Sequence, residues 1–444
     1  MFAGRFNRRE FLETSALSTA AALSVPYFAT ANAEEKDRPK SKIDRFRIGA
    51  IGMRYQGTVI TDGALPWGDV VAICDVDRRI AEKAREHYGG KADLYEDYRK
   101  MLDRNDIDVV TIGAPDHWHT AMAVAACRAG KHVYCEKPLT LTIDEGKLLC
   151  EVVRQSGVVF QVGTRFRSDH LCRLACETIR AGRLGKLNRI IVGLGKNPQG
   201  GPFKVTDPPP HLNWDMWLGQ APLVPYTKER CHYTFRWWYE YAGGKQADIG
   251  AHFLDLAQWA MGMQYSGPVE IEGKATFPDV PNGYNVASSY QMRMRYPNGV
   301  EVITGDHVPG GIRYEGRLGW LHGKRGEING EPFDLLKDDP IGQDQYQLYR
   351  HDNLERPLAT GKPGQTHRHM GNFFDCIRRG TPTLSDVRSQ HRAAAVCHLA
   401  NISQRLGRKL AWDPDREEFV GDEEANGHLR RRQRKGYEIS GGKS

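Results

Sequence analysis

The sequence lacks the C-x-x-C spacing of a structural metal site, although nine cysteines occur among its 444 residues. An odd number of cysteines does not suit a disulfide framework, and most of them lie inside apolar runs. Cys172 and Cys176 lie one helical turn apart, where disulfide geometry is poor. We therefore expect most of the thiols to be small buried side chains.

Long hydrophobic runs are also absent. The apolar stretch near the N-terminus, residues 16–29, has about 14 residues and includes Pro26, whereas a membrane-spanning helix needs about 20. We expect no stable membrane span. Charged residues make up 26% and hydrophobic residues 40% of the chain, which is an ordinary globular composition. No internal repeat is evident.

A strong excess of one charge is missing from the body of the chain. The formal net charge is +7, of which residues 1–33 carry +1 and the last seventeen residues, from His428, carry +5. Subtracting these leaves +1 for residues 34–427. A basic groove for nucleic acid is therefore not expected on the folded part.

The N-terminus has the features of an export signal. Residues 7–12 read Asn-Arg-Arg-Glu-Phe-Leu, an apolar stretch follows, and residues 31–33 form an A-x-A cleavage site. Adjacent arginines followed by Phe-Leu resemble the twin-arginine signal, which exports folded proteins. We predict a signal peptide over residues 1–33, the twin-arginine export machinery as a partner, and a periplasmic or otherwise exported location. An amphipathic N-terminal helix is the alternative.

Short apolar runs alternate with helical stretches between residues 45 and 162. Runs that are apolar throughout and separated by helices indicate a parallel sheet with helices on both faces, so this part is predicted to be α/β. The predicted strands are 46–51, 69–74, 108–112, 131–135 and 158–162, and the predicted helices are 78–88, 121–129 and 143–156.

The pattern changes beyond residue 165. We predict an α+β domain over residues 166–413 with an open, largely antiparallel sheet, because alternating runs flank the hairpin signal Pro297-Asn298-Gly299. Residues 414–444 are predicted to be a polar basic tail, disordered or used in subunit contacts. The predicted helices are 171–180, 367–379 and 389–405, and the predicted strand regions are 189–194, 286–296, 300–304 and 319–328.

The first predicted strand runs into residues 52–57, Gly-Met-Arg-Tyr-Gln-Gly, which is the dinucleotide-binding pattern G-x-G-x-x-G with Arg54 in place of the second glycine. Gly52 permits a tight turn, Gly57 lets the following helix pack on the strand, and the helix N-terminus faces a pyrophosphate. Because the middle glycine normally allows close backbone approach, the pyrophosphate must shift outward or Arg54 must contact it. With its strand and helix order, this pattern predicts a Rossmann domain over residues 44–165.

The end of the second predicted strand indicates the nucleotide. Asp75 follows Gly52 by 23 residues and can accept hydrogen bonds from a ribose diol, which favours NAD. Arg78 and Arg79 lie close enough to contact a 2′-phosphate, so NADP stays open.

Three further clusters are candidates for chemistry. Residues 113–119 follow the third strand and residues 136–138 follow the fourth, at the sheet edge where open α/β folds bind ligands. In the second domain, Asp248 and His252 have helical i, i+4 spacing and Asp255 follows. In isolation, such an Asp–His pair is more often a surface pair than a catalytic one.

Taken together, these motifs resemble the glucose–fructose oxidoreductase / inositol 2-dehydrogenase (Gfo/Idh/MocA) family over about residues 44–413. The resemblance implies a Rossmann domain, a second domain with an open antiparallel sheet, frequent oligomerisation through that sheet, and hydride transfer between NAD(P) and a sugar or polyol carbon. We therefore expect a carbohydrate or polyol substrate and a homo-oligomer. The matching features are Gly52 and Gly57, Pro115-Asp116-x-x-His119, residues 129–138, and Asp248-x-Gly250-x-His252-x-x-Asp255.

The resemblance places the family's catalytic residues on Lys137, Asp248 and His252. Oxidising a secondary alcohol needs a base for the hydroxyl proton, and His252 is the candidate. Asp248 would hold that hydroxyl or orient the imidazole, and Lys137 would stabilise developing alkoxide charge. The alternative is that Lys137 has no catalytic role and only marks the end of a strand.

We expect the cofactor to be lined by the motif residues of the Rossmann part. A metal site at His117-x-His119 is an alternative, because alternate residues on a strand can share one ion, but no further ligand set is evident and no metal is predicted. The predicted cofactor-binding residues are Gly52, Arg54, Gly57, Asp75, Pro115, His119, Glu136 and Lys137.

An aromatic stretch over residues 211–239 supplies candidates for the substrate. Aromatic faces beside Arg, His and Asp suit a carbohydrate, whose C–H faces stack while its hydroxyls form hydrogen bonds. The alternative is a packed loop that seals the domain junction. The candidates are Trp214, His232, Arg236 and Trp237, with Gln161 and Arg165 from the end of the Rossmann part.

Three functions follow from these residues. The first is an exported NAD(P)-dependent oxidoreductase acting on a sugar, sugar derivative or cyclitol, with its cofactor tightly held because no free NAD pool exists outside the cytoplasm. The second is an NAD-using glycosidase that works by transient oxidation and elimination, with Tyr233, Tyr239 or His232 as an additional acid or base. The third is a non-catalytic sugar-binding protein, which Arg54 favours and the retained Lys137 opposes.

Overall fold

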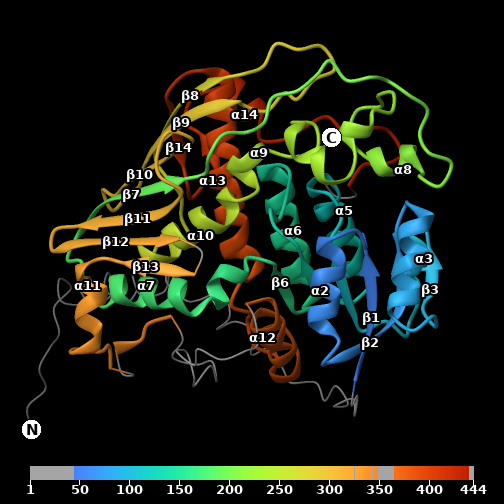
Figure 1. Ribbon diagram of the computed structural model, residues 1–444, viewed down its shortest axis with the longest axis horizontal. Helices are drawn as coiled ribbons and strands as arrows, with labels where there is room; N and C mark the ends of the chain where they lie inside the picture. The colour runs from blue at the N-terminus through green and yellow to red at the C-terminus, as the bar shows by residue number, and fades with distance from the viewer. Residues whose placement is uncertain (1–44, 325, 343–344, 349–364, 440–444) are drawn as a thin grey trace, which may run out of the picture. The chain divides into compact units, whose positions relative to one another are not determined.

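Six parallel strands form the sheet of the first domain in a computed structural model that describes residues 45–324, 326–342, 345–348 and 365–439. The strand order β3-β2-β1-β4-β5-β6 is that of a Rossmann sheet, with β3 and β6 at its edges, and Figure 1 shows β1, β2 and β3 next to one another. The predicted fold class of this domain is confirmed. The strands are β1 (Phe46–Ile51), β2 (Gly68–Cys74), β3 (Asp93–Tyr95), β4 (Val109–Ile112), β5 (His132–Cys135) and β6 (Phe160–Val162).

The helices between these strands begin and end at recognisable caps. Thr142 accepts a hydrogen bond from the Glu145 N–H at the start of α6, and Gly157, with φ 64°, ends it. Helix α5 begins at Asp116, directly after Pro115 and earlier than its apolar periodicity indicated. These helices are α2 (Gln56–Ala64), α3 (Arg78–His87), α4 (Tyr98–Leu102), α5 (Asp116–Arg128) and α6 (Ile143–Ser156).

A helix from the far end of the chain completes the core of the Rossmann domain. Helix α12 (Gln365–Arg379) packs against α2. Its Met370, Phe373 and Phe374 are fully buried in one cluster with Phe46 and Ile60. Helix α12 therefore packs with the Rossmann domain, although it lies far beyond the domain boundary predicted at residue 165.

Nine strands form the second sheet, in the order β13-β12-β11-β7-β10-β9-β8-β14-β15. Only β7 and β10 pair in parallel, and the other neighbours are antiparallel, so the largely antiparallel sheet is confirmed. The strands are β7 (Leu187–Gly193), β8 (Glu270–Thr276), β9 (Ser289–Arg295), β10 (Glu301–Gly305), β11 (Gly311–Gly316), β12 (Gly319–Lys324), β13 (Glu327–Asn329), β14 (Leu410–Asp413) and β15 (Glu418–Phe419).

Helices cover one face of the second sheet. Side chains along β9 alternate between buried and exposed, as a half-buried strand requires. Helix α13 lies between the two domains, with β8 on one side and α6 on the other (Figure 1). The helices of this layer are α7 (His170–Arg180), α9 (Gly244–Ala247), α10 (Gly250–Ala260) and α13 (Val387–Leu406), and the short α11 (Glu331–Asp334) and η4 (Leu335–Lys337) follow β13.

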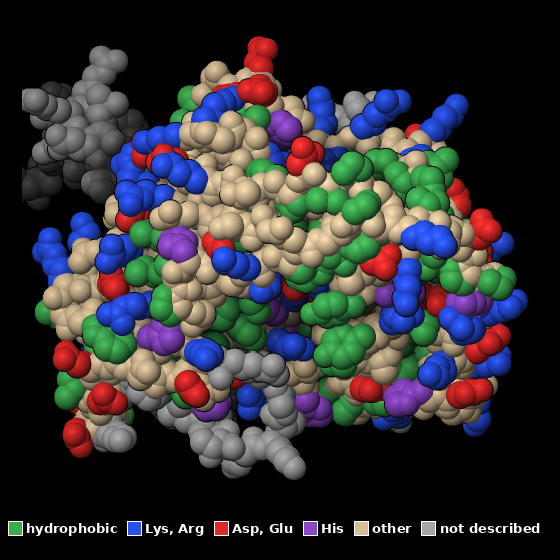
Figure 2. All heavy atoms as spheres, turned by 45° about the horizontal axis from the view of Figure 1, so that its top comes forward, with side chains coloured by type: hydrophobic (Ala, Val, Ile, Leu, Met, Phe, Trp, Pro, Cys, Tyr) green, Lys and Arg blue, Asp and Glu red, His purple; other side chains and the backbone are tan. Residues whose placement is uncertain are grey.

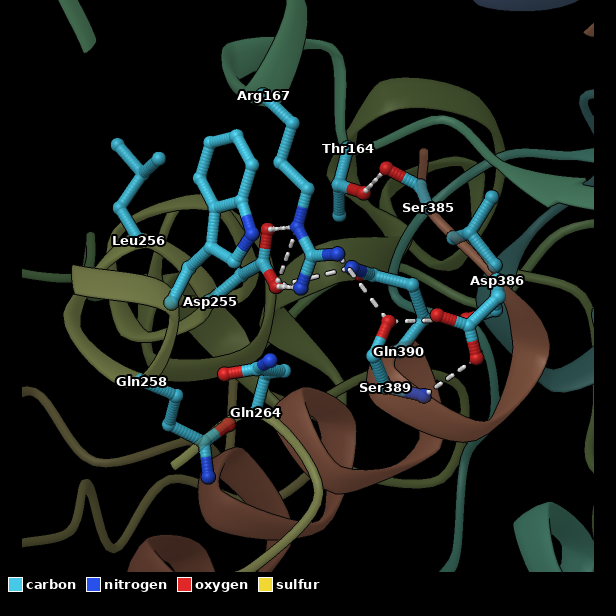
Figure 3. Close-up of polar contacts among 12 residues, drawn as sticks. Thr164, Arg167, Asp255, Leu256, Gln258, Gln264, Ser385, Asp386, Ser389 and Gln390 are labelled. Carbon is cyan, nitrogen blue, oxygen red and sulfur yellow. Dashed lines mark hydrogen bonds and ion pairs between the residues drawn. The ribbon is translucent and has the colours of Figure 1, made fainter. Parts of the chain in front are cut away.

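A buried ion pair fixes helix α10. Arg167, in η1 (Arg165–Ser168), donates to Asp255 at 2.5 and 2.9 Å, and both side chains are buried. Gln390 of α13 donates to the same carboxylate at 2.9 Å, and Figure 3 shows these groups turned toward one another. Asp255 therefore holds the helix that carries His252, and removing one partner of such a pair costs ~3–5 kcal/mol.

Residues 197–242, which we call the crossing segment, run from the second domain back over the Rossmann domain. Leu212 forms a β-bridge with Asp77, and the Arg78 N–H donates to the His211 carbonyl at 2.9 Å. The crossing segment is therefore hydrogen-bonded to the loop that follows β2. It contains α8 (Trp214–Leu218), η2 (Lys228–Arg230) and η3 (His232–Trp237).

The tail is ordered through residue 439, so the prediction of a disordered tail is wrong for this range. Leu429 and Ile439 are buried, and Arg434 donates to the Gly219 carbonyl of the crossing segment at 2.7 Å. Isolated apolar residues among many charges form no periodic pattern, but Leu429 joins the core of the second domain and Ile439 joins that of the Rossmann domain. The tail also contains α14 (Glu423–Gly427).

None of the nine cysteines, all of which lie in the described part of the chain, forms a disulfide, and seven of these residues are buried. The expectation of small buried side chains is confirmed. Among the described residues, no helix is both long and apolar enough to cross a membrane. The predicted export signal, residues 1–33, lies outside the described residues.

Candidate active site

A cleft of about 510 Å³ opens along the carboxyl ends of the Rossmann strands. Its walls come from the loops after β1, β2, β4 and β5, from η1 and η3, from α10, from the start of β11 and from the end of β12. The space-filling view shows a hollow in the middle of the molecular face, with apolar and basic side chains around it (Figure 2). The cleft therefore lies where open α/β sheets bind ligands.

The glycine loop after β1 is closely packed. Gly52 has φ +76°, and a Cβ there would lie 2.6 Å from the Ala114 nitrogen. A Cβ on Gly57 would lie 1.8 Å from the Gly52 carbonyl oxygen. Gly52 lines the cleft, whereas Gly57 supports the loop from behind. Both glycines thus have the roles that the sequence pattern indicated.

Asp75 lies at the end of β2 and lines the cleft. Its carboxylate accepts the Met53 N–H at 2.8 Å and the Asp77 N–H at 2.9 Å. Burial raises the pKa of Asp75 to about 6, although these hydrogen bonds oppose the shift. A carboxylate presented to the cleft at this point suits a ribose diol.

Arg54 turns toward the end of β2. Its Nη1 lies 3.9 Å from the Oδ2 atom of Asp77, a buried residue that caps α3. In this structure Arg54 is therefore held at the Asp75 end of the cleft, where it replaces the missing middle glycine.

Lys137 and Asp248 meet across the cleft. Lys137, after β5, donates through Nζ to Asp248 Oδ1 at 2.5 Å, and the Arg236 Nε lies 3.5 Å from Oδ2 of the same carboxylate. Burial alone would raise the pKa of Asp248, but the charges of Lys137 and Arg236 outweigh it and lower the pKa to about 2. Asp248 is therefore ionised and held between two cations.

His252 lies on α10, one turn beyond Asp248, and lines the cleft. Its ring stacks on Phe166 with centroids 4.3 Å apart, and only 4% of its surface is exposed. Burial and the charges of Lys137 and Arg165 hold the pKa of His252 well below its usual range. Its Nδ1 atom is buried without a hydrogen-bond partner among the described residues. The imidazole is therefore neutral and able to accept a proton.

Asp116, which the sequence reasoning missed as a site residue, is a further carboxyl of this cleft. It is the first residue of α5, and its surface is 6% exposed. Burial raises the pKa of Asp116 to about 7, partly opposed by Arg236. The sequence signal that could have identified Asp116 as a site residue is its position directly after Pro115, at the carboxyl end of β4.

The other predicted cofactor residues of the Rossmann domain also lie at the cleft. Pro115, His119 and Glu136 line it. Both ring nitrogens of His119 lie within hydrogen-bond distance of backbone carbonyls, of Pro138 at 2.7 Å and of Ala114 at 2.8 Å. Because burial lowers the pKa of His119 to about 4, the ring is neutral and its single N–H donates to one of these two carbonyls. In the described part of the chain, no cluster of His, Cys, Asp or Glu has metal-site geometry.

The predicted substrate residues separate into two groups. Arg165 and Arg236 line the catalytic end of the cleft, and His232 lines the Asp75 end, where the charges of Arg54 and Asp77 reach it. Gln161, Trp214 and Trp237 are buried outside the cleft lining, where they serve packing. The missed lining residues include Gln56, Asp116, Phe166 and Lys324.

The residues present fit a dinucleotide. The first turn of α2 faces the cleft, and its cap residue, Tyr55, supplies no side-chain acceptor for the free N–H groups. These groups suit a pyrophosphate, and Asp75 suits the ribose beyond it. The unpartnered nitrogen of His252 lies on the opposite wall.

Comparison with protein families agrees with this geometry. The oxidoreductase family with an NAD-binding Rossmann fold matches residues 46–164, and the C-terminal alpha/beta domain of the same oxidoreductase family matches residues 200–331 and 344–439. The chain therefore belongs to the Gfo/Idh/MocA family of oxidoreductases, and its first domain is the NAD-binding domain of that family.

Two kinds of curated relative match part of the chain. A levoglucosan dehydrogenase from Pseudarthrobacter phenanthrenivorans is 30% identical over 199 residues, 45% of this chain. A glycosyl hydrolase family 109 protein from Shewanella sp. (strain ANA-3) is 35% identical over 205 residues, 41% of this chain. The chain spans 44% of the length of each of these relatives.

Solved structures share the whole fold. Levoglucosan dehydrogenase in complex with NADH and levoglucosan has a TM-score of 0.61 at 18% identity, covering 85% of this chain and 100% of that one. The WlbA dehydrogenase from Bordetella pertussis, in complex with NADH and UDP-GlcNAcA, has a TM-score of 0.62 at 16% identity, covering 84% and 99%. Because the identities are only 18% and 16%, the structural similarity establishes the fold alone.

Proposed function

We propose that the protein is an NAD-dependent oxidoreductase that transfers a hydride to or from a CH–OH carbon of a sugar, sugar derivative or cyclitol. One observation carries the proposal. Lys137 and Asp248, from two domains, form an ion pair in the cleft, and His252 lines the same cleft as the glycine loop and Asp75. The family match adds the NAD-binding domain.

The chain's own residues supply the proton chemistry. When bound, the nicotinamide of NAD accepts or donates the hydride. His252, kept neutral by burial and by neighbouring cations, takes the proton of the substrate hydroxyl. Asp248 holds that hydroxyl, and Lys137 stabilises the negative charge that develops on its oxygen.

The crossing segment would retain the cofactor. It is hydrogen-bonded to the loop after β2, because the Asn213 N–H donates to the Val76 carbonyl at 2.9 Å and the Asn213 side chain donates to Glu96 at 2.6 Å. Glu96 and Val76 both line the cleft. A nucleotide bound beneath these contacts leaves only when they open.

The tail locks the crossing segment. Asp215 of α8 accepts a hydrogen bond from the Tyr437 hydroxyl at 2.6 Å and forms an ion pair with Arg434. Tyr437 also packs edge-on against Trp118, with ring centroids 6.0 Å apart. A tightly held cofactor agrees with these contacts and with recycling of NAD within one site.

Export, oligomerisation and the location of the protein remain parts of the proposal. The twin-arginine signal would carry a folded protein with its cofactor already loaded, and the motif at residues 7–12 supports this. The family resemblance supports a homo-oligomer.

An NAD-using glycosidase is the second candidate. Tyr233 lines the same cleft, is 64% exposed, and lies with its ring 4.6 Å from the Arg236 guanidinium, so it can serve as an additional acid. Glycosyl hydrolase family 109 relatives favour this reaction. The sugar would be oxidised transiently, its glycosidic bond broken by elimination, water added to the resulting double bond, and the hydride returned, so that the net reaction is hydrolysis.

One experiment separates these functions. The mature protein is purified, bound nucleotide is released with acid and identified, and intact protein is incubated with labelled free sugars and glycosides. Nucleotide with a keto-sugar product supports the oxidoreductase, and glycoside cleavage without net cofactor reduction supports the glycosidase. Absence of nucleotide, with no spectral change on adding NAD or NADP, contradicts both and leaves a sugar-binding protein.

A further inference from the structure

Charge is unevenly distributed along the cleft. The end near β2 is lined by the carboxylates of Asp75, Asp77 and Glu96, with Arg54 beside them. The end that holds His252 is lined instead by four basic side chains. These are Lys137, Arg165, Arg236 and Lys324.

Two of the four basic groups have carboxylate partners, and both share the same one. Lys137 and Arg236 approach the two oxygens of Asp248 at 2.5 and 3.5 Å. The three groups together carry one net positive charge. That charge faces the position where negative charge develops on the substrate oxygen.

The other two basic groups lack such a partner. Among the described residues, no carboxylate oxygen lies within 4.0 Å of Arg165 or Lys324. Arg165, half-buried after β6, has the Thr366 hydroxyl at 3.5 Å. Lys324 is exposed at the end of β12. A half-buried guanidinium without a counter-ion is costly unless a ligand supplies one.

The remaining acidic groups only partly offset this excess. Glu136 is buried and already accepts hydrogen bonds from Gln56 at 2.9 Å and from the Lys137 N–H at 3.2 Å. Burial raises the pKa of Asp116 to about 7, so this carboxyl is only partly ionised near neutral pH and offsets the excess only in part. Counting Glu136 against Arg165 and Lys324 leaves about one unbalanced positive charge.

We propose that the substrate is a sugar acid, whose carboxylate binds between Arg165 and Lys324 while its reacting hydroxyl faces His252. The inference rests on the proposed function and adds the substrate class. A carboxylate carries one negative charge, which balances the unpaired charge, whereas a phosphate monoester carries about −1.5 to −2 at pH 7. The guanidinium fork of Arg165 matches carboxylate geometry.

The wall beside these groups suits the sugar ring. Phe166 follows Arg165 directly and stacks on His252, and Phe253 of α10 lies edge-on to Phe166, with centroids 5.6 Å apart. Both rings line the cleft. The apolar C–H face of the sugar can therefore stack here while its carboxylate reaches the basic groups.

Binding to the NAD-loaded protein tests the proposal. Isothermal titration compares matched probes, namely glucose with glucuronate, galactose with galacturonate, and glucose with gluconate, with glucose 6-phosphate as the second anion. We expect the acid of at least one pair to bind at least tenfold more tightly than its neutral partner, and its dissociation constant to rise with salt.

Substitutions test which residues cause the tighter binding of the acid. Arg165→Gln and Lys324→Gln should each weaken acid binding about tenfold, and by more than they weaken neutral-sugar binding. Lys274→Gln, which removes an exposed lysine on β8, is the matched control and should change neither. Lys324 is exposed, so its variant remains informative if the Arg165 variant fails to fold.

The outcomes separate this proposal from the proposed function. Equal affinities across every pair, tighter binding of the phosphate, or acid binding that is insensitive to both variants overturns the sugar-acid proposal. Oxidation of neutral sugars without preference supports the oxidoreductase and overturns only the substrate class. Acid binding that depends on both variants, without hydride transfer, keeps the anion site and contradicts the oxidoreductase.

Discussion

His252 illustrates how the surroundings of one side chain prepare it for proton transfer. A histidine exposed to water has a pKa near neutrality, so part of it is protonated at working pH. Stacking on Phe166 and the charges of Lys137 and Arg165 keep this ring neutral. The base is therefore in its active form over the whole physiological range.

Replacing His252 tests this role. His252→Ala should lower the turnover number by about 10²–10⁴-fold, which is the usual contribution of a general base, and leave bound nucleotide in place. Single-turnover absorbance of NADH measures the loss. His87→Ala, on the exposed side of α3, is the control. Turnover equal to that of the unaltered protein would contradict the assignment.

Asp116 is predicted to make stability depend on pH. Its pKa in the folded protein is about 7 against an ordinary value of 3.8, so the folded state binds more protons than the unfolded state in this window, and stability falls as pH rises through it. Asp116→Asn removes this loss. The free energy of unfolding of the variant minus that of the unaltered protein should be ~3 kcal/mol larger at pH 8 than at pH 5.

Urea denaturation at both pH values measures this difference. Asp103→Asn, an exposed residue at the end of α4, serves as the matched control and should show no such gain. Parallel pH dependence of the Asp116 variant and the unaltered protein would show that Asp116 does not ionise in this range.

At the scale of elements, the crossing segment and the tail act as one unit over the cofactor site. The crossing segment has its own packed aromatic cluster, whereas its link to the tail consists of separate polar contacts such as Asp215 with Arg434 and Tyr437. Such contacts are individually weak and open more readily than a packed core. Cofactor exchange is therefore expected to be controlled here.

Weakening the lock should speed cofactor release. Asp215→Ala removes the partner of both tail residues, a loss of ~1 kcal/mol because the carboxylate is partly exposed, which corresponds to about fivefold faster release. Exchange of bound nucleotide against labelled NAD measures the rate. Arg432→Gln, an exposed tail arginine, is the control. An unchanged rate in the Asp215 variant would place the barrier elsewhere.

At the scale of the whole molecule, export in the folded state would connect the signal peptide to the enzyme. A cofactor held by elements from both domains can be loaded only once the domains have folded together. The twin-arginine route accepts folded proteins, and residues 7–12 carry its motif.

Exchanging the two arginines tests this route. Arg8→Lys with Arg9→Lys should leave the protein in the cytoplasm of a bacterium that has the twin-arginine machinery, whereas Arg5→Lys should not. Immunoblots of the periplasmic and cytoplasmic fractions measure the distribution. Undiminished export of the double variant would assign the N-terminus another role.

Local patterns predicted most of the regular structure. The strand expected at 46–51 coincides with β1, and the helix expected at 143–156 coincides with α6, because unbroken apolar runs, caps and helical periodicity are local properties. The short β3 and the ordered tail were missed. Each depends on a few isolated apolar contacts rather than on a repeated pattern.

The candidate site divides in the same way. The residues at the ends of strands, such as Asp75 and Lys137, could be predicted because parallel strands deliver their carboxyl ends to one edge. Trp214 and Trp237 could not be separated from Arg236 by sequence, since all three lie in one aromatic stretch. Only folding turned Arg236 into the cleft and buried the two indoles in the core.

The sequence by itself determined the parallel sheet, the glycine loop and the candidates for proton transfer, since these depend on neighbours along the chain or on a repeated strand geometry. The tertiary structure decided which charged groups, distant in the sequence, lie close enough to form ion pairs. It placed Arg236 with Lys137 on one carboxylate, left Arg165 and Lys324 without such a partner in the described part of the cleft, and drew the basic tail onto the crossing segment. Coulomb interactions depend on distance in space, which the order of residues does not specify.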